Sequence, residues 1–395
     1  MIRLWRRPKL CDLTRGKYLY ALHCVPLRAI GSDCTVPVAL SVCMVWRNRG
    51  RVVTSERAKT HSISGDPSEF ISLIEPYRRE LHLHCYRLLG SLYDAEDLVQ
   101  ETMLRAWQHF DTFKGQASLR TWLYRIATNA CLDALKKRLP RTLPVAVSPA
   151  ADPLNPLAPA WAESTWLEPY PDSWLAEATE DPAARYSRRE SVSLAFLIVL
   201  QLLPPRQRAI LLLSDVLDWR TSEIASLLSI SVSAVNSALH RARVTMAKQY
   251  HTHERERGEG LEADAATQAL LERYLHAWET EDVAGLVALM KEDATFTMPP
   301  SPSWYLGREA IRTVLTTQAF APLAQNRWHF SPTRVNGCPA FAVYHATGLG
   351  GTFRAFGIQV VTLDDSAPGL LIADVTTFLD PSLLPFFGFP TELPR

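Results

Sequence analysis

The stretch Thr221–Lys248, TSEIASLLSISVSAVNSALHRARVTMAK, predicts two helices joined by a short turn. The first helix should end at Leu228, and the second should begin at Val232. The small side chain of Ala225 allows the two helices to approach closely, and an apolar residue such as Val235 packs the second helix onto the first. The stretch therefore predicts a helix-turn-helix.

The face of the second helix that points away from the first carries hydroxyl, amide and guanidinium groups, which suit base edges and phosphates in a DNA major groove. The residues on this face are Ser233, Asn236, Ser237, His240, Arg241 and Arg243. Residues 232–250 contain no acidic residue, so the face is cationic and favours DNA binding. The turn has Ser229 where glycine is usual, and an ordinary helical hairpin with a solvated face is the alternative interpretation.

A helix is also predicted for Ser118–Arg138, SLRTWLYRIATNACLDALKKR, because its apolar side chains recur at spacings of three and four. This apolar face comprises Leu119, Trp122, Leu123, Ile126, Ala127, Ala130, Cys131 and Leu135. The opposite face comprises Arg120, Thr121, Tyr124, Arg125, Thr128, Asn129, Lys136 and Lys137. We interpret Trp122 as part of the core and the opposite face as exposed.

That opposite face is aromatic and cationic, since only Asp133 opposes six basic residues between Arg120 and Arg141. Aromatic rings stack on unpaired bases while cations contact phosphates, and each stacked base contributes about 1–3 kcal/mol. The face therefore predicts binding of an unpaired DNA strand.

An acidic patch precedes this helix, on another helix predicted for Asp94–Trp107, DAEDLVQETMLRAW. Asp94 or a neighbour can cap the positive end of that helix. The polar face comprises Asp94, Glu96, Asp97, Gln100 and Glu101. Because this surface repels DNA, it predicts a contact with another protein, although taken alone it is more typical of a solvated helix face.

A different composition marks Thr142–Ala184, which contains seven acidic residues, many prolines and no lysine or arginine. Proline at this density removes backbone hydrogen-bond donors, so the stretch is predicted to be an extended linker. Four aromatic residues interrupt it: Trp161, Trp166, Tyr170 and Trp174. These rings predict that the linker docks on another surface.

Composition excludes several classes of protein. The chain has 395 residues, enough for two or three compact units, and its net charge of +1 conceals a strong segregation of charge along the chain. No apolar run is long enough to span a membrane, so we expect no membrane association. The seven cysteines show no metal-ligand spacing, which predicts neither a metal nor a cofactor and suits a reducing cytosol.

The first 51 residues differ from the rest, with ten Lys/Arg against Asp12 and Asp33. We interpret them as sequence translated from upstream of the true start, with Val52 or Val53 as the first codon. A basic tail or a targeting segment is the alternative.

Helix Thr267–Ala288 is followed by strand-like segments, which predicts a small α+β domain. Candidate general bases in it are Asp293, His329, His345 and Asp374. No pair of them has a diagnostic spacing, so we expect no catalytic site and no enzyme activity. The predicted segments are a basic extension that is either a mis-called start or disordered (1–64), a helical module (65–139), an acidic linker (140–184), a second helical module (185–252), a hydrophilic linker (253–265) and the α+β domain (266–390).

Three motifs in this order carry a family resemblance: DAEDLVQETMLRAW, then F-x-G-x-x-S-L-R-T-W-L-Y-R-I-A-T-N, then LPPRQR with EIASLL and SVSAVNSALHRAR. Together they resemble the sigma-70 family, and within it the extracytoplasmic-function group of RNA polymerase sigma factors. WLEPYPD in the linker and the C-terminal domain resemble the subset with a SnoaL-like cone domain, the sigma factor G type. The resemblance covers about Phe70 to Pro390.

The resemblance implies a cytoplasmic transcription-initiation factor whose partners are core RNA polymerase, at its β′ clamp and β flap, and promoter DNA. The polymerase contacts would be Asp94, Asp97, Gln100 and Glu101. The −10 element would be opened and held by Phe113, Lys114, Arg120, Tyr124, Arg125, Thr128, Asn129, Lys136 and Lys137. The −35 element would be read by the six outward residues of the helix-turn-helix.

The resemblance also implies that the linker threads the nucleic-acid channels of the polymerase, where its acidic residues are electrostatically similar to RNA. The C-terminal domain would regulate transcription, by contact with the sigma modules or by binding a small-molecule ligand, and an anti-sigma factor is a further possible partner. The alternatives are a stand-alone helix-turn-helix regulator with a ligand-sensing cone, and a cone-domain isomerase or hydrolase fused to a DNA-binding domain.

Overall fold

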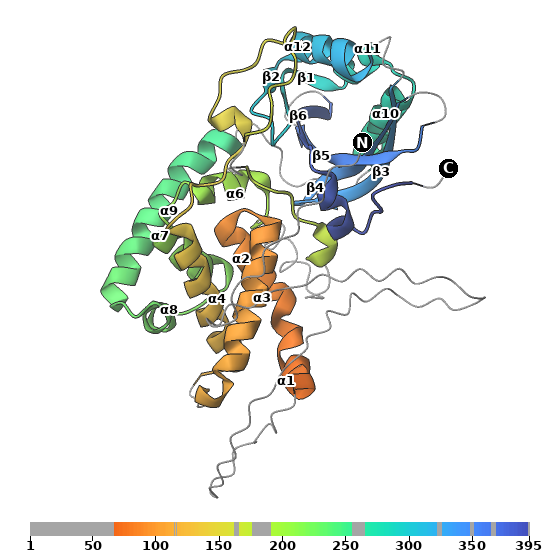
Figure 1. The fold of residues 1–395 in the computed structure, drawn as a ribbon. Coiled ribbons are helices and arrows are strands. Elements are labelled where there is room, and N and C mark those ends of the chain that lie inside the picture. The colour runs from red at the N-terminus through yellow and green to blue at the C-terminus, as the bar shows by residue number, and fades with distance from the viewer. Residues whose placement is uncertain are drawn as a thin grey trace, which may run out of the picture. The chain divides into compact units, whose positions relative to one another are not determined.

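The computed structural model describes residues 67–113, 115, 117–161, 166–175, 191–254, 265–321, 326–347, 351–364 and 369–393 (Figure 1). The basic extension predicted for residues 1–64 lies outside these residues, and so does Lys114. The described part contains two all-helical modules, a linker between them and a C-terminal α+β domain, which confirms the predicted fold class.

The first helical module is built from amphipathic helices around a core that includes Leu81, Val99 and Leu123. Its elements are α1 (Pro67–Ile74), η1 (Glu75–Tyr77), α2 (Arg78–Leu89), α3 (Leu92–Gln108), η2 (Phe110–Thr112) and α4 (Leu119–Leu135). Gly90 ends α2 with a φ of 70°, and an added Cβ there would lie 2.7 Å from Cδ2 of Leu167 in the linker. Glycine is required at this position by both the backbone and the close approach of the linker.

The second helical module contains the predicted helix-turn-helix. Its elements are α6 (Leu194–Gln201), α7 (Pro205–Leu211), the π-helical turn η6 (Leu212–Val216), α8 (Thr221–Leu228) and α9 (Val232–Glu254). Ala225 of α8 and Val235 of α9 are buried, as predicted. Ser229 ends α8 in the left-handed conformation, with a φ of 54°, and so makes the turn that glycine usually makes.

The C-terminal domain is a mixed six-stranded sheet with helices packed on one face (Figure 1). The strand order is β2-β1-β6-β5-β4-β3, in which only β1 and β6 pair in parallel. The helical elements are α10 (Ala265–Glu279), α11 (Val283–Ala288), α12 (Arg308–Val314), η7 (Leu315–Ala319) and η8 (Pro381–Phe387). The strands are β1 (Met290–Thr297), β2 (Trp304–Leu306), β3 (Asn326–Val335), β4 (Cys338–Thr347), β5 (Arg354–Asp364) and β6 (Leu371–Phe378).

Alternate residues of β4 belong to two different hydrophobic cores, one on each face of the sheet. Phe341 and Val343 join the core that α10 covers with Tyr274 and Trp278. Tyr344, on the other face, joins the core that is continuous with both helical modules. The sheet therefore packs against the helical modules through its second face, and the space under α10 is filled with aromatic side chains.

Candidate nucleic-acid and polymerase interfaces

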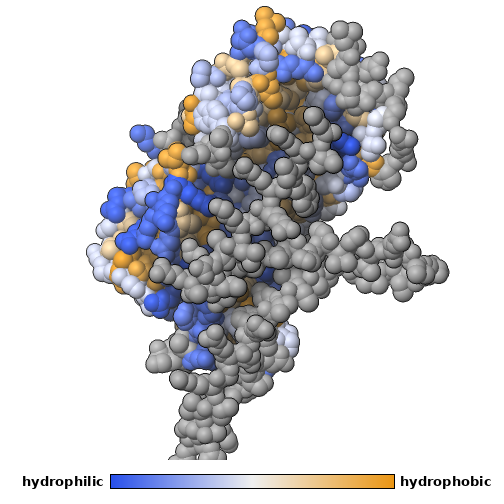
Figure 2. All heavy atoms as spheres, viewed as in Figure 1, coloured by the Kyte–Doolittle hydropathy of each residue, from blue (hydrophilic) through white to orange (hydrophobic). Residues whose placement is uncertain are grey.

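The outward face of α9 is exposed along its whole predicted length. Ser233, Asn236, Ser237, His240, Arg241 and Arg243 are all exposed, while Val235, Leu239 and Ala242 between them are buried. Arg243 donates to both carboxylate oxygens of Asp215, at 3.0 and 2.7 Å. In Figure 2 hydrophilic residues gather on the part of the surface that the second helical module forms. The arrangement presents a hydrogen-bonding helix face with exposed His240 and Arg241 to solvent.

The N-terminus of α9 is fixed by Ser231, whose Oγ accepts from the backbone N–H of Ala234 at 3.1 Å. Glu223 fixes the start of α8, because its carboxylate accepts from the backbone N–H of Arg220 at 2.8 Å. These caps hold the angle between the two helices and set the direction of the outward face.

The face of α4 that the sequence predicts to bind unpaired DNA is only partly exposed. Arg125, Asn129, Lys136 and Lys137 are exposed, as predicted. Tyr124 and Thr128 are buried, at 1% and 0% exposure, so the prediction that they lie on an open face is wrong. The cause is that α4 is covered on two sides, by α2 and by the second module.

The contacts of Tyr124 come from both modules. Its ring lies 5.6 Å from the ring of Trp219, which precedes α8, and 5.0 Å from that of His84 on α2. Arg120 stacks over Tyr124 at 4.9 Å and is held by an ion pair with Glu80 at 2.9 Å. An unpaired base cannot stack on Tyr124 while the second module occupies this position.

Phe113, at the start of the predicted −10 loop, belongs to an aromatic cluster. Its ring lies 5.2 Å from that of Trp122 and 6.1 Å from that of Phe110. Trp122 is half-buried in this cluster, in agreement with its interpretation as a packing residue.

The acidic patch on α3 is divided in two. Asp97 and Gln100 are exposed, and Glu101 is half-exposed with its carboxylate 2.6 Å from Arg105. Asp94 instead pairs with Arg138 and Arg141. Although burial raises the pKa of Asp94, these two ion pairs hold it below its ordinary value.

Of the residues around Asp94 that the sequence offers as a helix cap, the structure selects Ser91. Ser91, not Asp94, caps α3, because its Oγ accepts from the backbone N–H of Asp94 at 3.0 Å. Asp94 therefore lies inside an ion-pair cluster, where it orders the end of the first module instead of projecting towards a partner.

The linker docks on its own chain, through Glu168 above all. Its Oε2 accepts from Ser91 Oγ at 2.9 Å and from the backbone N–H groups of Leu92 and Tyr93 at 2.7 and 3.3 Å, which places the carboxylate at the N-terminus of α3. Its Oε1 pairs with Arg141 at 3.1 Å. Burial nevertheless raises the pKa of Glu168. The aromatic residues predicted this docking but not its location.

The tip of the β3–β4 hairpin joins three parts of the chain, and sequence reasoning missed it. Asn336 is 1% exposed, with Nδ2 donating to Tyr86 Oη at 3.1 Å and to the carbonyl of Val192 at 2.6 Å. Its Oδ1 accepts from the backbone N–H of Tyr170 at 2.8 Å. Asp172 accepts from the backbone N–H of Gly337 at 2.9 Å. The Asn-Gly pair at 336–337 signals a hairpin turn, but no sequence pattern shows where its tip docks.

Two histidines of α2 are buried in this junction. Burial lowers the pKa of His82 to about 4, although the nearby carboxylate of Glu96 acts to raise it. Burial, together with the positive charges of Arg87 and Arg120, lowers the pKa of His84 to about 3. His82 also faces Tyr170 Oη at 3.3 Å and Arg78, while His84 Nε2 lies 2.9 Å from Thr128 Oγ1. Both rings are therefore neutral at pH 7.

Acid should destabilise the chain through these two histidines. Well above pH 6.5, both imidazoles are neutral in the folded and unfolded states. Below pH 6.5 the two imidazoles of the unfolded chain take up protons, whereas those of the folded chain stay neutral. The free energy of unfolding therefore falls as the pH falls towards the folded pKa values. We expect a loss of about 2–3 kcal/mol in the free energy of unfolding between about pH 7.5 and 5.5, measured by urea titration. His82→Gln/His84→Gln should flatten this slope. An unchanged slope would contradict the assignment.

The candidate bases of the C-terminal domain are not brought together. Asp293 has a 72% exposed side chain, and Asp374 accepts from Thr295 Oγ1 at 2.6 Å. His329 contacts the ring of Tyr344, and His345 contacts that of Trp328. Within the part of the chain that the structure describes, no group of three or more His, Cys, Asp or Glu is arranged to hold a metal ion.

Among the described helices, no single one is long and apolar enough to cross a membrane. One strongly bent pair, α8 with residues Val232–Lys248 of α9, meets the length and composition criteria when taken together.

Family models match three parts of the chain: Sigma-70 region 2 at residues 73–139, Sigma-70 region 4 at residues 194–246 and a SnoaL-like domain at residues 271–367. The ECF RNA polymerase sigma factor SigG of Mycobacterium tuberculosis is 42% identical over 376 residues, which cover 92% of this chain and 95% of that protein. SigW of Bacillus subtilis, also described as an ECF RNA polymerase sigma factor, is 28% identical over 47% of this chain and 90% of its own length. The crystal structure of M. tuberculosis SigJ aligns with a TM-score of 0.47 and 22% identity, covering 80% of this chain and 98% of SigJ.

Proposed function

Because this chain belongs to the extracytoplasmic-function group of the sigma-70 family, we propose that it initiates transcription through two DNA-binding surfaces and one polymerase-binding surface. As a sigma factor it binds core RNA polymerase and directs it to promoters. The observation that carries the assignment of surfaces is the exposed cationic face of α9. We propose no catalytic role, and we place its action in the cytoplasm with the polymerase. The proposed modules are residues 65–139, 185–252 and 266–390, joined by linkers at 140–184 and 253–265.

The face of α9 is proposed to read the −35 element in the major groove. Asn236, His240 and Arg241 have the amide, imidazole and guanidinium groups that pair with base edges. The smaller Ser233 and Ser237 suit close approach to the backbone, and Arg243 is positioned by Asp215.

The −10 strand is proposed to bind α4 and the loop before it. Arg125, Asn129, Lys136 and Lys137 are exposed, and Phe113 lies at the start of the loop. Lys114, which lies outside the described residues, is proposed to join them. Tyr124 would join them only after the second module moves away from α4, because Trp219 covers it. Arg120 and Thr128 would join them by exchanging their contacts with Glu80 and His84 of α2. The described conformation is thus proposed to be a closed one that polymerase opens.

Core polymerase is proposed to bind the exposed part of the acidic patch, Asp97, Gln100 and Glu101, through its β′ clamp. Asp94 would take part only by exchanging its pairs with Arg138 and Arg141. The β flap is the proposed partner of the second module. An anti-sigma factor would compete for these same surfaces.

The C-terminal domain is proposed to stabilise the closed conformation through Asn336, whose side chain bonds to the first module, the linker and the residue that precedes the second module's first helix. Loss of these bonds leaves buried polar groups unpaired, which favours the open conformation. Regulation would then act by contact between domains of one chain.

Asn336→Ala should raise the yield of promoter-specific transcript several-fold at limiting core polymerase, because the closed conformation loses three hydrogen bonds. Run-off transcription measures the yield. Ser331→Ala, on the same hairpin, is the control and should leave it unchanged. Equal yields from wild type and Asn336→Ala would remove the hairpin from the regulatory mechanism.

The experiment for the proposed function is run-off transcription with purified core polymerase and a promoter library. The account expects transcripts from a defined subset of promoters only when the chain is present, and weak binding of the chain alone to the same DNA. Tight promoter binding without polymerase, with no transcripts, would instead identify a stand-alone helix-turn-helix regulator.

A further inference from the structure

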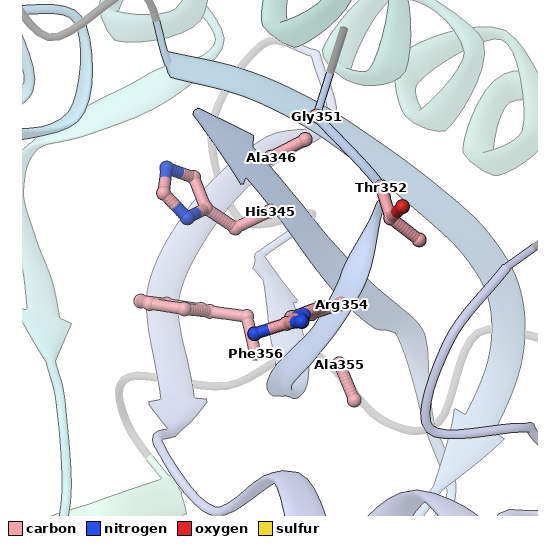
Figure 3. A pocket seen from close by; sticks show the side chains of 7 residues that line it. All are labelled: His345, Ala346, Gly351, Thr352, Arg354, Ala355 and Phe356. Carbon is pink, nitrogen blue, oxygen red and sulfur yellow. The ribbon is translucent and has the colours of Figure 1, made fainter. Parts of the chain in front are cut away.

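A cavity of about 370 Å³ opens at the end of the C-terminal sheet where β4 ends and β5 begins. His345, Thr352, Arg354 and Phe356 are among the residues that line it. Figure 3 shows the side chains of His345, Arg354 and Phe356 directed to the same side of the two strands, with Ala355 directed to the other. His345 and Arg354 are register partners across the β4–β5 pair. The cavity is therefore formed by neighbouring, well-positioned strands.

The rings of His345 and Phe356 form one wall of the cavity, and Trp328 packs against both of them. The ring of Trp328 lies 4.6 Å from that of His345 and 5.0 Å from that of Phe356, at an interplanar angle of 82° to Phe356. His345 and Phe356 rings are 6.0 Å apart. Burial lowers the pKa of His345, which favours the neutral ring at pH 7. This wall offers faces and edges for a planar aromatic ligand.

The deeper space between α10 and the sheet is occupied by the chain itself. The ring of Trp278 lies 5.0 Å from that of Phe330 and 5.1 Å from that of Phe320. Because these aromatic side chains pack in the interior, we place the ligand in the rim cavity, whose volume suits a small molecule. A cavity of this volume is at the lower end of the range for small-molecule sites, about 300–1,000 Å³.

Arg354 supplies a positive charge to the lining of the cavity. Its side chain is 76% exposed, and its Nε lies 3.3 Å from Oε1 of Glu392, which is itself 58% exposed. Such exposed ion pairs contribute about 0–1 kcal/mol, so a carboxylate ligand can replace Glu392 at little cost. Guanidinium binds carboxylates in a planar, two-bonded geometry that fixes the orientation of the bound group.

We propose that this rim cavity binds a small aromatic carboxylate, with the ring against Phe356 and His345 and the carboxylate on Arg354. The site goes beyond the role in transcription and does not depend on it. Glu392 lies on the segment that pairs with β5, since the N–H of Ala355 donates to the carbonyl of Thr391 at 2.8 Å. The same segment follows η8, whose Phe386 contacts the ring of Tyr93 on α3 at 5.2 Å. A ligand that displaces Glu392 therefore acts on a segment that reaches the first helical module.

The probe for this site is 2-naphthoate, compared with its neutral analogue 2-naphthamide, in titration calorimetry with the full chain. We expect a Kd for 2-naphthoate on the order of 100 µM, and at least about tenfold weaker binding of the amide. Arg354→Gln should weaken binding of the acid about tenfold and leave that of the amide unchanged. Phe356→Leu should weaken both.

Two further variants make the test specific. Glu392→Gln removes the competing carboxylate and should strengthen 2-naphthoate binding up to about fivefold. Arg312→Gln, at a half-exposed arginine paired with Glu309 in the same domain, is the matched control and should have no effect. Absence of saturable 2-naphthoate binding, equal affinities for acid and amide, or an Arg354→Gln variant that binds like wild type would each overturn the proposal. None of these results depends on polymerase or promoter DNA, so failure here leaves the transcriptional role unaffected.

Discussion

His240→Glu/Arg241→Glu should reduce promoter-specific transcription about a thousandfold. Both side chains lie on the exposed face of α9, so their replacement removes two contacts to the −35 duplex and places two negative charges against its phosphates. Each good base contact is worth about 1–3 kcal/mol, and a combined loss of about 4 kcal/mol corresponds to a thousandfold. Run-off transcription on a −35-dependent promoter measures the effect.

The control for this prediction is Arg312→Glu, at a half-exposed arginine of α12 in the C-terminal domain. It changes the net charge by two without altering α9. Because the paired variant leaves the acidic patch of α3 intact, its binding to core polymerase should be retained. Equal transcription by His240→Glu/Arg241→Glu and wild type would show that α9 does not read the promoter.

Arg208→Ala should lower the free energy of unfolding by about 3–5 kcal/mol. Arg208 is 1% exposed and lies on α7. Its guanidinium donates to the carbonyls of Gln201 and Leu203 at 2.8 and 3.2 Å, and to that of Leu88 at the end of α2. The substitution leaves these buried carbonyls unpaired and opens a cavity between the two helical modules.

Urea titration measures this loss, and Arg206→Ala is the matched control. Arg206 lies on the same helix, two residues earlier, but is exposed, so its replacement should change stability by less than about 0.5 kcal/mol. If Arg208→Ala were as stable as Arg206→Ala, the bonds between α7 and α2 would not hold the modules together.

Helical periodicity predicted the helices and the exposed face of α9 well, because the six side chains of that face are exposed and only Arg243 among them has a described ion pair, with Asp215 of η6. The same reasoning was wrong for Tyr124 and Thr128 on α4. An apolar stripe identifies one buried face, whereas α4 meets α2 through His84 and the second module through Trp219. Polar and aromatic residues can fill such a second contact, so the sequence pattern of α4 does not reveal it.

The sequence also does not predict the ion pairs and loop contacts between residues that are far apart in the chain. Asp94 was predicted to face a partner, yet its partners Arg138 and Arg141 lie more than forty residues further along the chain. The docking of Asn336 has no sequence signal, because an Asn-Gly turn is typical of any hairpin. Asp94 depends on how the segment after α4 folds back onto α3, and Asn336 depends on how the C-terminal domain packs on the helical modules. Local sequence patterns carry no information about either contact.

Assembly with core RNA polymerase tests the central claim most directly. The full chain and core enzyme, mixed and separated by size-exclusion chromatography, should elute together with β′, and Asp97→Lys/Glu101→Lys should weaken this co-elution at least about tenfold because both carboxylates lie on the exposed part of α3. Elution of the wild-type chain apart from β′ under all conditions would contradict the account.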